Sequence, residues 1–447
     1  MNANLQYVLS RVSAVSTQTF KLEPQNSTTA VAGSQIRVNL PSNTLLSLSS
    51  IKLLAGVTTT GSGVRLPSKI ESIIDRISLE CGGVTIDGGS SQSYGLLCHA
   101  KGVLEGSVVN ATSHPEMVRA KSYHTGGAAI TGTNNEEVPS ANEAFTFDLT
   151  HCFLGSAKPT ILDTSLIPSC TLIINLHGNE VLSTVAGVTM ADFKSDGTKS
   201  PTYTLQHIRF LCECIGLGSG VYDQLIERRL ADSVIEIPFK QYTTCLDTHN
   251  GSTRFHVSCQ SLDRLWAVFR APGYDDMGAP VAVQGSTTTG GFIAATSGGT
   301  VNVEVGLPQY DSGSNIPEKY IQKYNDMYFG ANNALFQFQI NGSLTPGFNG
   351  NIAEWFEISK NAVTPIHGGV SPCKTLDQYR SNFSVICHRL CLPNSDVREI
   401  SGMDCRGVNL SGSLNSQNLP ANTNVTIFLE HTSVLQISNQ KQIAVVT

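Results

Sequence analysis

IIDRISLECGGVTID, residues 73–87, is the stretch that decides the fold. Apolar and polar side chains alternate in its first half, so that one face of a strand carries Ile77, Leu79 and Cys81. Gly82-Gly83 follows and predicts a two-residue turn, because glycine adopts a positive φ without steric cost. We therefore expect an antiparallel hairpin with one buried face and one solvated face, which is the unit of a β-sandwich.

The turn also predicts which residues face one another across this hairpin. A two-residue turn pairs Cys81 with Val84, and the next pair on the same face is Leu79 with Ile86. These four side chains are expected to lie together on the buried face.

A second hairpin is predicted at Leu335–Thr345, LFQFQINGSLT. Asn341-Gly342 is the strongest short signal for a hairpin turn. The alternation before it places the apolar residues on one face and the two glutamines on the other, with the apolar face made by Phe336, Phe338 and Ile340.

Other strands and helices follow from the same patterns. Helical spacing predicts helices at 93–105, 317–330 and 352–359. Further strands are expected at 35–40, 45–54, 144–149, 169–176, 202–215, 234–239, 253–258, 265–269, 384–390, 424–430, 434–437 and 443–446. We expect an N-terminal arm at 1–30, a first β-domain at 31–185, a linker at 186–201 and a second β-domain at 202–447. Each half then contains one glycine-turn hairpin, which suggests an internal duplication.

Composition limits the function. The chain has 447 residues, of which 40% are hydrophobic, enough for two cores, and only 14% are charged. That charge content is well below the roughly 25% of an average soluble protein, and charged residues are depleted at the cores of protein interfaces. The net charge is −6 and no run of Lys or Arg exceeds two residues, which argues against a surface that coats nucleic acid.

The 12 cysteines are spread singly along the chain, so we expect reduced thiols that act as small buried hydrophobic groups. Cys212 and Cys214 share a strand face but are poorly placed to bond each other. The N-terminus lacks the apolar segment of a signal peptide, and no apolar run approaches the roughly 18 residues of a membrane span. Asn-x-Ser/Thr sequons are therefore expected to stay unmodified.

No sequence motif predicts a reaction. A phosphate-binding loop, a dinucleotide fingerprint and a nucleophile elbow are each incomplete or absent. Cys387-His388 with Cys391 lacks a fourth zinc ligand at recognisable spacing. The acidic pairs Glu136-Glu137 and Asp275-Asp276 are typical of solvated loops, and the strand acids Glu80 and Glu236 have no evident partner for glycoside hydrolysis. We expect no enzyme activity and no catalytic, cofactor-binding or metal-binding residue.

Four local matches resemble one family, the double jelly-roll major capsid proteins of the adenovirus-like and nucleocytoplasmic large DNA virus lineage, with virophage and polinton-like virus proteins the most similar in look. The matching segments are IDRISLECGGVTID (74–87), LIPSCTLIINL (166–176), VYDQLIERRLADSVIEIPFKQY (221–242) with 254–270, and RSNFS (380–384) with NVTIFLEHTSVLQISNQKQIAVV (424–446). The run Glu227-Arg228-Arg229 is shorter than in larger relatives, and Val385 stands where the family usually has aspartate.

The resemblance implies an all-β structural protein with a few short helices, made of two tandem eight-stranded antiparallel jelly rolls. It implies a major capsid protein, located in the virion and made in the host cytoplasm or virus factory. Its homotrimers would tile an icosahedral shell around double-stranded DNA without binding nucleic acid directly. Implied partners are other copies of the chain, vertex (penton) and cement proteins, and an internal lipid membrane. The loops at 107–142 and 271–314 would form an outer crown or clasps, and the arm would lie beneath.

Two other readings compete. A viral spike or lectin-like attachment protein built from two β-sandwiches would expose a cluster of aromatic side chains in its loops. An enzyme of the glycosidase or lyase kind would need paired carboxylates in a cleft.

Overall fold

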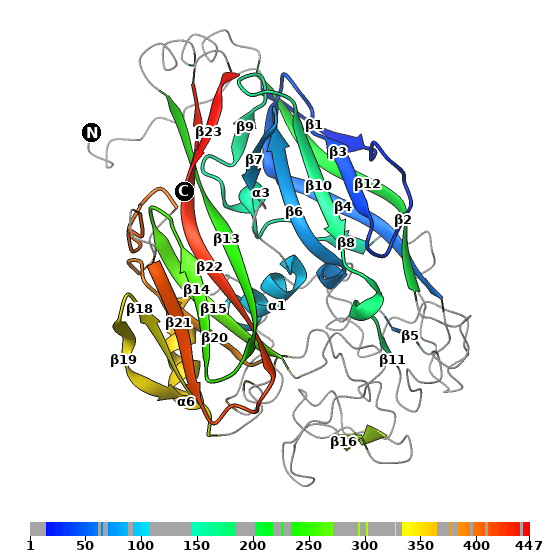
Figure 1. The fold of residues 1–447 in the computed structure, drawn as a ribbon. Coiled ribbons are helices and arrows are strands. Elements are labelled where there is room, and N and C mark those ends of the chain that lie inside the picture. Colours follow the sequence, from blue (N-terminus) through cyan, green and yellow to red (C-terminus); the bar gives the residue numbers. More distant parts are fainter. Residues whose placement is uncertain are drawn as a thin grey trace, which may run out of the picture.

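The computed structural model shows a molecule built mainly of antiparallel sheets (Figure 1). The structure describes residues 15–60, 64–65, 70–87, 93–106, 145–184, 202–217, 226, 234–270, 294–295, 301–302, 327, 333–363, 376, 379, 383–393, 397–406, 410–438 and 441–447.

The first half of the chain forms two sheets. One has the order β1-β12-β4-β8 and the other the order β3-β10-β6-β7. Their strands are β1 (Val15–Leu22), β3 (Gln35–Asn39), β4 (Leu45–Thr60), β6 (Ile74–Cys81), β7 (Val84–Asp87), β8 (Phe145–Phe147), β10 (Cys170–Leu176) and β12 (Thr202–Leu217). Short strands accompany them: β2 (Ala30–Val31) pairs with β12, β9 (Ile161–Asp163) pairs with β4, and β5 (Val64–Arg65) pairs with β11 (Ser183–Thr184).

The second half repeats this arrangement. Its sheets have the orders β13-β22-β15-β20 and β14-β21-β18-β19. Their strands are β13 (Ile235–His249), β14 (Ser252–Val257), β15 (Leu262–Arg270), β18 (Leu335–Ile340), β19 (Ser343–Asn351), β20 (Val385–Arg389), β21 (Leu410–Gln417) and β22 (Thr423–Ile437). β23 (Ile443–Val446) pairs with β22, and β16 (Ala294–Ala295) pairs with β17 (Val301–Asn302).

The two halves have the same connectivity. When the eight strands of either half are taken in chain order, the first, eighth, third and sixth form one sheet, and the second, seventh, fourth and fifth form the other. This is the jelly-roll arrangement. Both glycine-turn hairpins, β6–β7 and β18–β19, join the fourth and fifth strands of their half, as the suggested duplication requires.

Three helices and two short 3-10 turns complete the described elements. They are η2 (Ile70–Ile73), α1 (Tyr94–Glu105), α3 (Phe153–Ser156), η3 (Asn179–Val181) and α6 (Ile352–Ala362). The predicted helices at 93–105 and 352–359 are confirmed as α1 and α6. At the start of α6, Asn351 and Glu354 form a reciprocal capping box that satisfies two backbone donors. No helix in the described parts of the chain is long and apolar enough to cross a membrane.

Strand pairing corrects the expected N-terminal arm. Within 1–30, residues 15–22 form β1, which pairs with β12 from Val15↔Leu217 to Leu22↔Phe210. This strand has no buried apolar stripe: Ser16 to Phe20 are all exposed, so main-chain hydrogen bonding rather than hydrophobic burial holds it, and periodicity gave no signal.

The expectation that the strand at 202–215 opens the second half is also wrong. As β12, it pairs with β4 and β1 and closes the first roll. The segments predicted at 424–430 and 434–437 are one strand, β22, which pairs with β13 over its whole length. Within β22, Glu430 to Ser433 interrupt the apolar run but are buried, so the polar interruption suggests a break that burial and pairing override.

The first hairpin forms as predicted except for its register. Gly82 and Gly83 both have positive φ, 56° and 85°, and Cys81 pairs with Val84. Leu79, however, pairs with Asp87 rather than Ile86, because a bulge lies between Leu79 and Glu80. The bulge buries Asp87, whose carboxylate accepts a hydrogen bond of 2.6 Å from the backbone N–H of Phe153.

The second hairpin has the predicted Asn341-Gly342 turn, with φ values of 48° and 82°. The predicted apolar face is buried. Gln337, predicted to be solvated, is also buried, and its Nε2 donates to the Pro346 carbonyl at 2.9 Å. Pro346 belongs to the returning strand β19, which is otherwise exposed along most of its length.

The cysteine prediction is wrong at one pair. Cys81 and Cys170 face each other in the β6–β10 ladder and form a disulfide, with Cα atoms 4.2 Å apart. Their pairing depends on the register between strands 89 residues apart in sequence, which spacing alone does not reveal. The other described cysteines are free, and Cys212 and Cys214 do not bond each other, as predicted.

Several predicted features lie outside the described residues. They are the start of the arm (1–14), the linker at 186–201, the loop at 107–142, both acidic pairs and nearly all of the helix at 317–330. Of the loop at 271–314, only the short β16–β17 pair is described.

Candidate functional site: the joint between the two rolls

Helix α1 joins the two rolls by packing into both cores (Figure 1). It follows β7 in the first roll, and its Tyr94 and Cys98 belong to the first core. Gly95 lets the helix approach η2, because a Cβ at this position would lie 2.4 Å from the Ser72 Cα. The opposite face of α1 contributes to the second core through Leu96, Leu97, Ala100, Val103 and Leu104.

Strands β13 and β22 make the reciprocal connection. Their paired ends enter the first core through Ile237, Phe239, Leu435 and Ile437. Phe239 meets Phe153 of α3 edge to face, with ring centroids 5.0 Å apart. The Ser156 hydroxyl also accepts a hydrogen bond from the Lys240 backbone N–H at 3.0 Å. Each roll therefore supplies elements that complete the core of the other.

A buried carboxylate, Glu430 of β22, lies at the centre of this joint. Its Oε1 is 2.7 Å from Nη1 of Arg264, and its Oε2 accepts a hydrogen bond from Nε1 of Trp266 at 2.9 Å. The side chain of Glu430 is 1% exposed. Burial alone would raise the pKa of Glu430, but Arg264, Lys101 and Lys240 outweigh burial and lower it to about 2.

Lys101 of α1 brings the first roll into this network. Its Nζ donates to the Tyr242 hydroxyl at 2.9 Å and lies 3.7 Å from Oε2 of Glu105. Burial tends to lower the pKa of Lys101, but Glu105, Tyr242 and Glu430 raise it above its usual value, so the ammonium stays charged. The cation on α1 is thus held by groups from both rolls.

A second buried ion pair lies on the same strands. Lys240 Nζ is 2.7 Å from Oδ2 of Asp263, which also accepts a hydrogen bond from the Thr432 hydroxyl at 2.7 Å. The other oxygen of Asp263 accepts from the Ser261 hydroxyl at 2.8 Å. Both ion pairs lie within the second roll, and Lys101 of α1 links their network to the first roll. Moving α1 away would take a buried cation from this network, which is costly.

We expect the buried imidazole of His431 to make the stability of the fold sensitive to acid. Its ring nitrogens contact the hydroxyls of Thr243 and Ser433, and burial lowers its pKa to about 4. The unfolded chain, with a histidine pKa near 6.5, binds more protons than the fold between these values, so stability is lost as the pH falls through this window. We expect the free energy of unfolding to drop by about 2 kcal/mol between pH 7 and pH 5 from this group. Urea denaturation at both pH values measures it.

The matched variants for this measurement are His431→Gln and, on exposed β14, His256→Gln. The first should lose less stability on acidification than the wild type, and the second should behave like the wild type. Equal pH dependence in His431→Gln and the wild type would refute the assignment.

The residues singled out in the sequence do not assemble into a chemical centre. Cys387 is buried in β20, and Nε2 of its neighbour His388 lies 2.7 Å from the Thr345 hydroxyl. Cys391 is only partly buried beyond the strand. Glu236 accepts a hydrogen bond from Gln436 on the neighbouring strand. Among the described residues no group of three or more His, Cys, Asp or Glu side chains could hold a metal ion.

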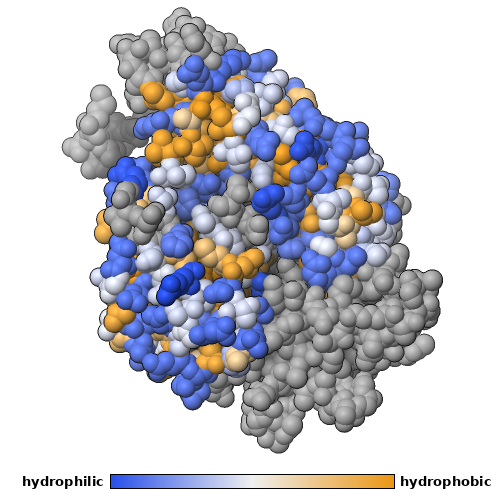
Figure 2. Space-filling model, in the orientation of Figure 1, coloured by the Kyte–Doolittle hydropathy of each residue, from blue (hydrophilic) through white to orange (hydrophobic). Residues whose placement is uncertain are grey.

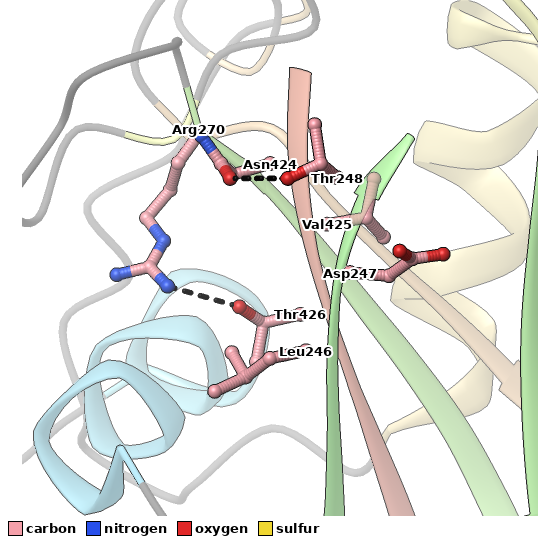
Figure 3. A pocket seen from close by; sticks show the side chains of 7 residues that line it. All are labelled: Leu246, Asp247, Thr248, Arg270, Asn424, Val425 and Thr426. Carbon is pink, nitrogen blue, oxygen red and sulfur yellow. Dashed lines mark hydrogen bonds between the residues drawn. The ribbon is translucent and has the colours of Figure 1, made fainter. Parts of the chain in front are cut away.

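A hollow of about 270 Å³ lies at the other end of β13, β15 and β22 (Figure 3). Arg270 lines it and donates from Nη2 to the Thr426 hydroxyl at 3.1 Å. Figure 3 shows Asp247 pointing away from the guanidinium, on the other side of the strands. The lining therefore lacks the convergent polar groups of a ligand site.

The outer surface exposes apolar side chains on strand edges. Phe20 of β1 is 44% exposed, and Leu344 and Phe348 of β19 are 50% and 49% exposed. Figure 2 shows a further apolar patch in the area where β23 lies in Figure 1. β1 and β19 each end a sheet among the described strands, and such edges invite pairing or covering by another chain.

Sequence reasoning missed the residues of the joint. Glu430 ends the predicted strand at 424–430, Arg264 directly precedes the predicted strand at 265–269, and Lys101 lies in the predicted helix at 93–105. A signal was present: Glu430-His431 interrupts an otherwise apolar strand, and a charged residue inside such a run requires a buried partner. The identity of that partner needs the tertiary structure.

Comparison with solved structures finds the same fold in other proteins. The chain is similar to VP54 of PBCV-1, in the structure fitted into a reconstruction of the virophage Sputnik, with a TM-score of 0.60, 14% identity and 99% of both chains covered. It is similar to the PBCV-1 virus capsid (TM-score 0.58, 13% identity, 99% of both chains). The Faustovirus major capsid protein also matches (TM-score 0.54, 11% identity, 98% of this chain and 93% of that one). No family model and no curated protein sequence matches. At these identities the likeness shows the fold, a double jelly roll, as predicted.

Proposed function

We propose that this chain is a major capsid protein, a structural subunit of an icosahedral DNA virus shell that performs no reaction. The observation that carries the proposal is the double jelly roll itself, matched over 99% of the chain by VP54 of PBCV-1 and by the PBCV-1 capsid. The Faustovirus protein with the same fold is a major capsid protein. The proposal places this chain in the virion.

The joint supports this function on physical grounds. A shell subunit must keep one shape while its rim meets neighbours. The shared cores and the hydrogen bond from Lys101 of α1 to Tyr242 of β13 fix the two rolls relative to each other. The low charge content and the exposed apolar side chains on β1 and β19 suit a rim that neighbours cover.

The assembly and domain details are part of the proposal. We propose homotrimers of pseudo-hexagonal outline that contact neighbouring trimers, vertex proteins and cement proteins, with an internal membrane beneath. We also propose domain limits that follow the strand pairing, with the first roll at 15–217 and the second at 235–447. The loops at 107–142 and 271–314 are proposed as crown or clasps.

The test is the assembly state of the purified chain. We expect a mass near three times 47.8 kDa in native mass spectrometry at physiological salt, and hexagonal outlines in negative stain. A dilution series separates a stable trimer from concentration-driven aggregation. A stable monomer across that series would count decisively against the proposal.

The attachment-protein alternative gains no support from the described residues. Both tryptophans, Trp266 and Trp355, are fully buried rather than displayed as a binding platform. A glycan array with the purified chain addresses this alternative directly, and specific glycan binding by a monomer would favour it.

A further inference from the structure

Cys259 and Cys405 lie next to each other in the second roll, where the segment before β21 runs alongside the segment after β14. The Cys405 backbone N–H donates to the Cys259 carbonyl at 2.9 Å. Leu262, the first residue of β15, lies three residues after Cys259. It exchanges reciprocal backbone hydrogen bonds with Met403, both of 2.9 Å. A backbone hydrogen bond between two residues brings their Cα atoms into the range of separations that a disulfide spans.

The same chain provides an internal precedent. Cys81 and Cys170 are opposed across β6 and β10 and are bonded. In both rolls the seventh strand is involved: Cys170 begins β10, and Cys405 lies shortly before β21. Cys259 and Cys405 are free thiols, and each is 0% exposed.

The two thiols also influence each other's titration. Hydrogen bonding to the Cys259 thiol lowers the pKa of Cys405, while contact with Cys405 raises the pKa of Cys259. The thiolate is the nucleophile in disulfide formation, so either sulfur can attack a mixed disulfide formed on the other.

We propose that Cys259 and Cys405 are a second disulfide site, which closes when a disulfide oxidant such as oxidised glutathione is present while the chain folds, before both thiols are buried. The Cys405 thiolate attacks one glutathione sulfur and forms a mixed disulfide, releasing one glutathione thiolate. The Cys259 thiol then gives up its proton and attacks the Cys405 sulfur, which forms the Cys259–Cys405 bond and releases the second glutathione. Two protein thiols are oxidised and one glutathione disulfide is reduced.

Closure would stabilise the second roll. The new bond would enclose the chain from β15 to β20 in a covalent ring, and long closed loops lose the most entropy in the unfolded state. A bond of this kind is expected to raise the melting temperature by about 5 °C for a chain of this size.

The experiment compares the purified chain refolded from urea with and without oxidised glutathione. Free thiols are alkylated under denaturing conditions, and disulfide-linked peptides are identified by mass spectrometry after digestion without reductant. We expect two fewer alkylated thiols, a linked Cys259–Cys405 peptide and the rise in melting temperature. The Cys81–Cys170 peptide serves as the internal reference for an oxidised pair.

Two variants sharpen the result. Cys405→Ser should show neither the thiol loss nor the temperature rise, whereas Cys391→Ser, on the neighbouring segment, should behave like the wild type. The peptide mapping of the wild type decides the matter even if Cys405→Ser folds poorly. A Cys259 that remains alkylatable after oxidation, or a link from Cys405 to another cysteine, would overturn the proposal.

Discussion

Glu430→Gln should lower the free energy of unfolding by about 3–5 kcal/mol, because the substitution leaves buried cations without their central carboxylate. Arg264 loses the anion 2.7 Å from its Nη1, and Lys101 loses one of the charges that hold its ammonium in the joint. The amide keeps the shape of the side chain, so the loss reports charge rather than volume. Urea denaturation followed by circular dichroism at pH 7 measures it.

The matched control is Asp404→Asn. Asp404 pairs with Arg406 at 2.7 Å, the same distance as the pair in the joint, but both side chains are more than half exposed. Exposed ion pairs contribute little to stability, so the midpoint should not move. If Glu430→Gln also left the midpoint unchanged, the buried charges around Glu430 would not stabilise the second roll and its contact with α1.

Leu97→Ala should cost about 2–5 kcal/mol, because it removes a buried side chain from the face of α1 that enters the second core. Leu97 is 1% exposed, although the helix belongs to the first roll by sequence. The cavity would lie where the rolls meet, so we expect the loss in transitions monitored in either roll. Thermal unfolding and urea denaturation both measure it.

Leu392→Ala is the control for this substitution. Leu392 is 62% exposed, so the same change of side chain removes little buried surface and should leave stability nearly unchanged. A loss confined to the first roll, detected by hydrogen exchange of β3 and β10 but not of β15 and β22, would show that α1 does not couple the rolls.

Both substitutions are also expected to affect assembly of the proposed shell. A subunit of a shell transmits contacts from one edge to another only if its two rolls move as one body. Weakening the joint through Glu430 or Leu97 is therefore expected to reduce trimer yield under conditions in which the exposed control variants assemble normally.

Local pattern was enough to predict most of the long strands and the turns of both hairpins, but it missed β1 and β21. The alternation in residues 73–87 and the Asn341-Gly342 turn were interpreted correctly, because side-chain period and glycine conformation are properties of neighbouring residues. The hydrophobic pattern did not predict a strand that is held mainly by main-chain hydrogen bonds and has few buried side chains. β1 is exposed from Ser16 to Lys21 and has no alternation of apolar and polar side chains, so the sequence predicts an arm there rather than a strand.

The sequence by itself determined an all-β chain with two cores and two glycine-turn hairpins. Tertiary structure alone decided that β12 closes the first roll, that Cys81 meets Cys170, and that Lys101, Arg264 and Glu430 converge in one joint. The reason is physical. The periodicity of buried side chains depends on residues that are close in sequence. Strand register and ion pairs, in contrast, join segments far apart in the chain, and the partners of these segments are determined only when the sheets pack.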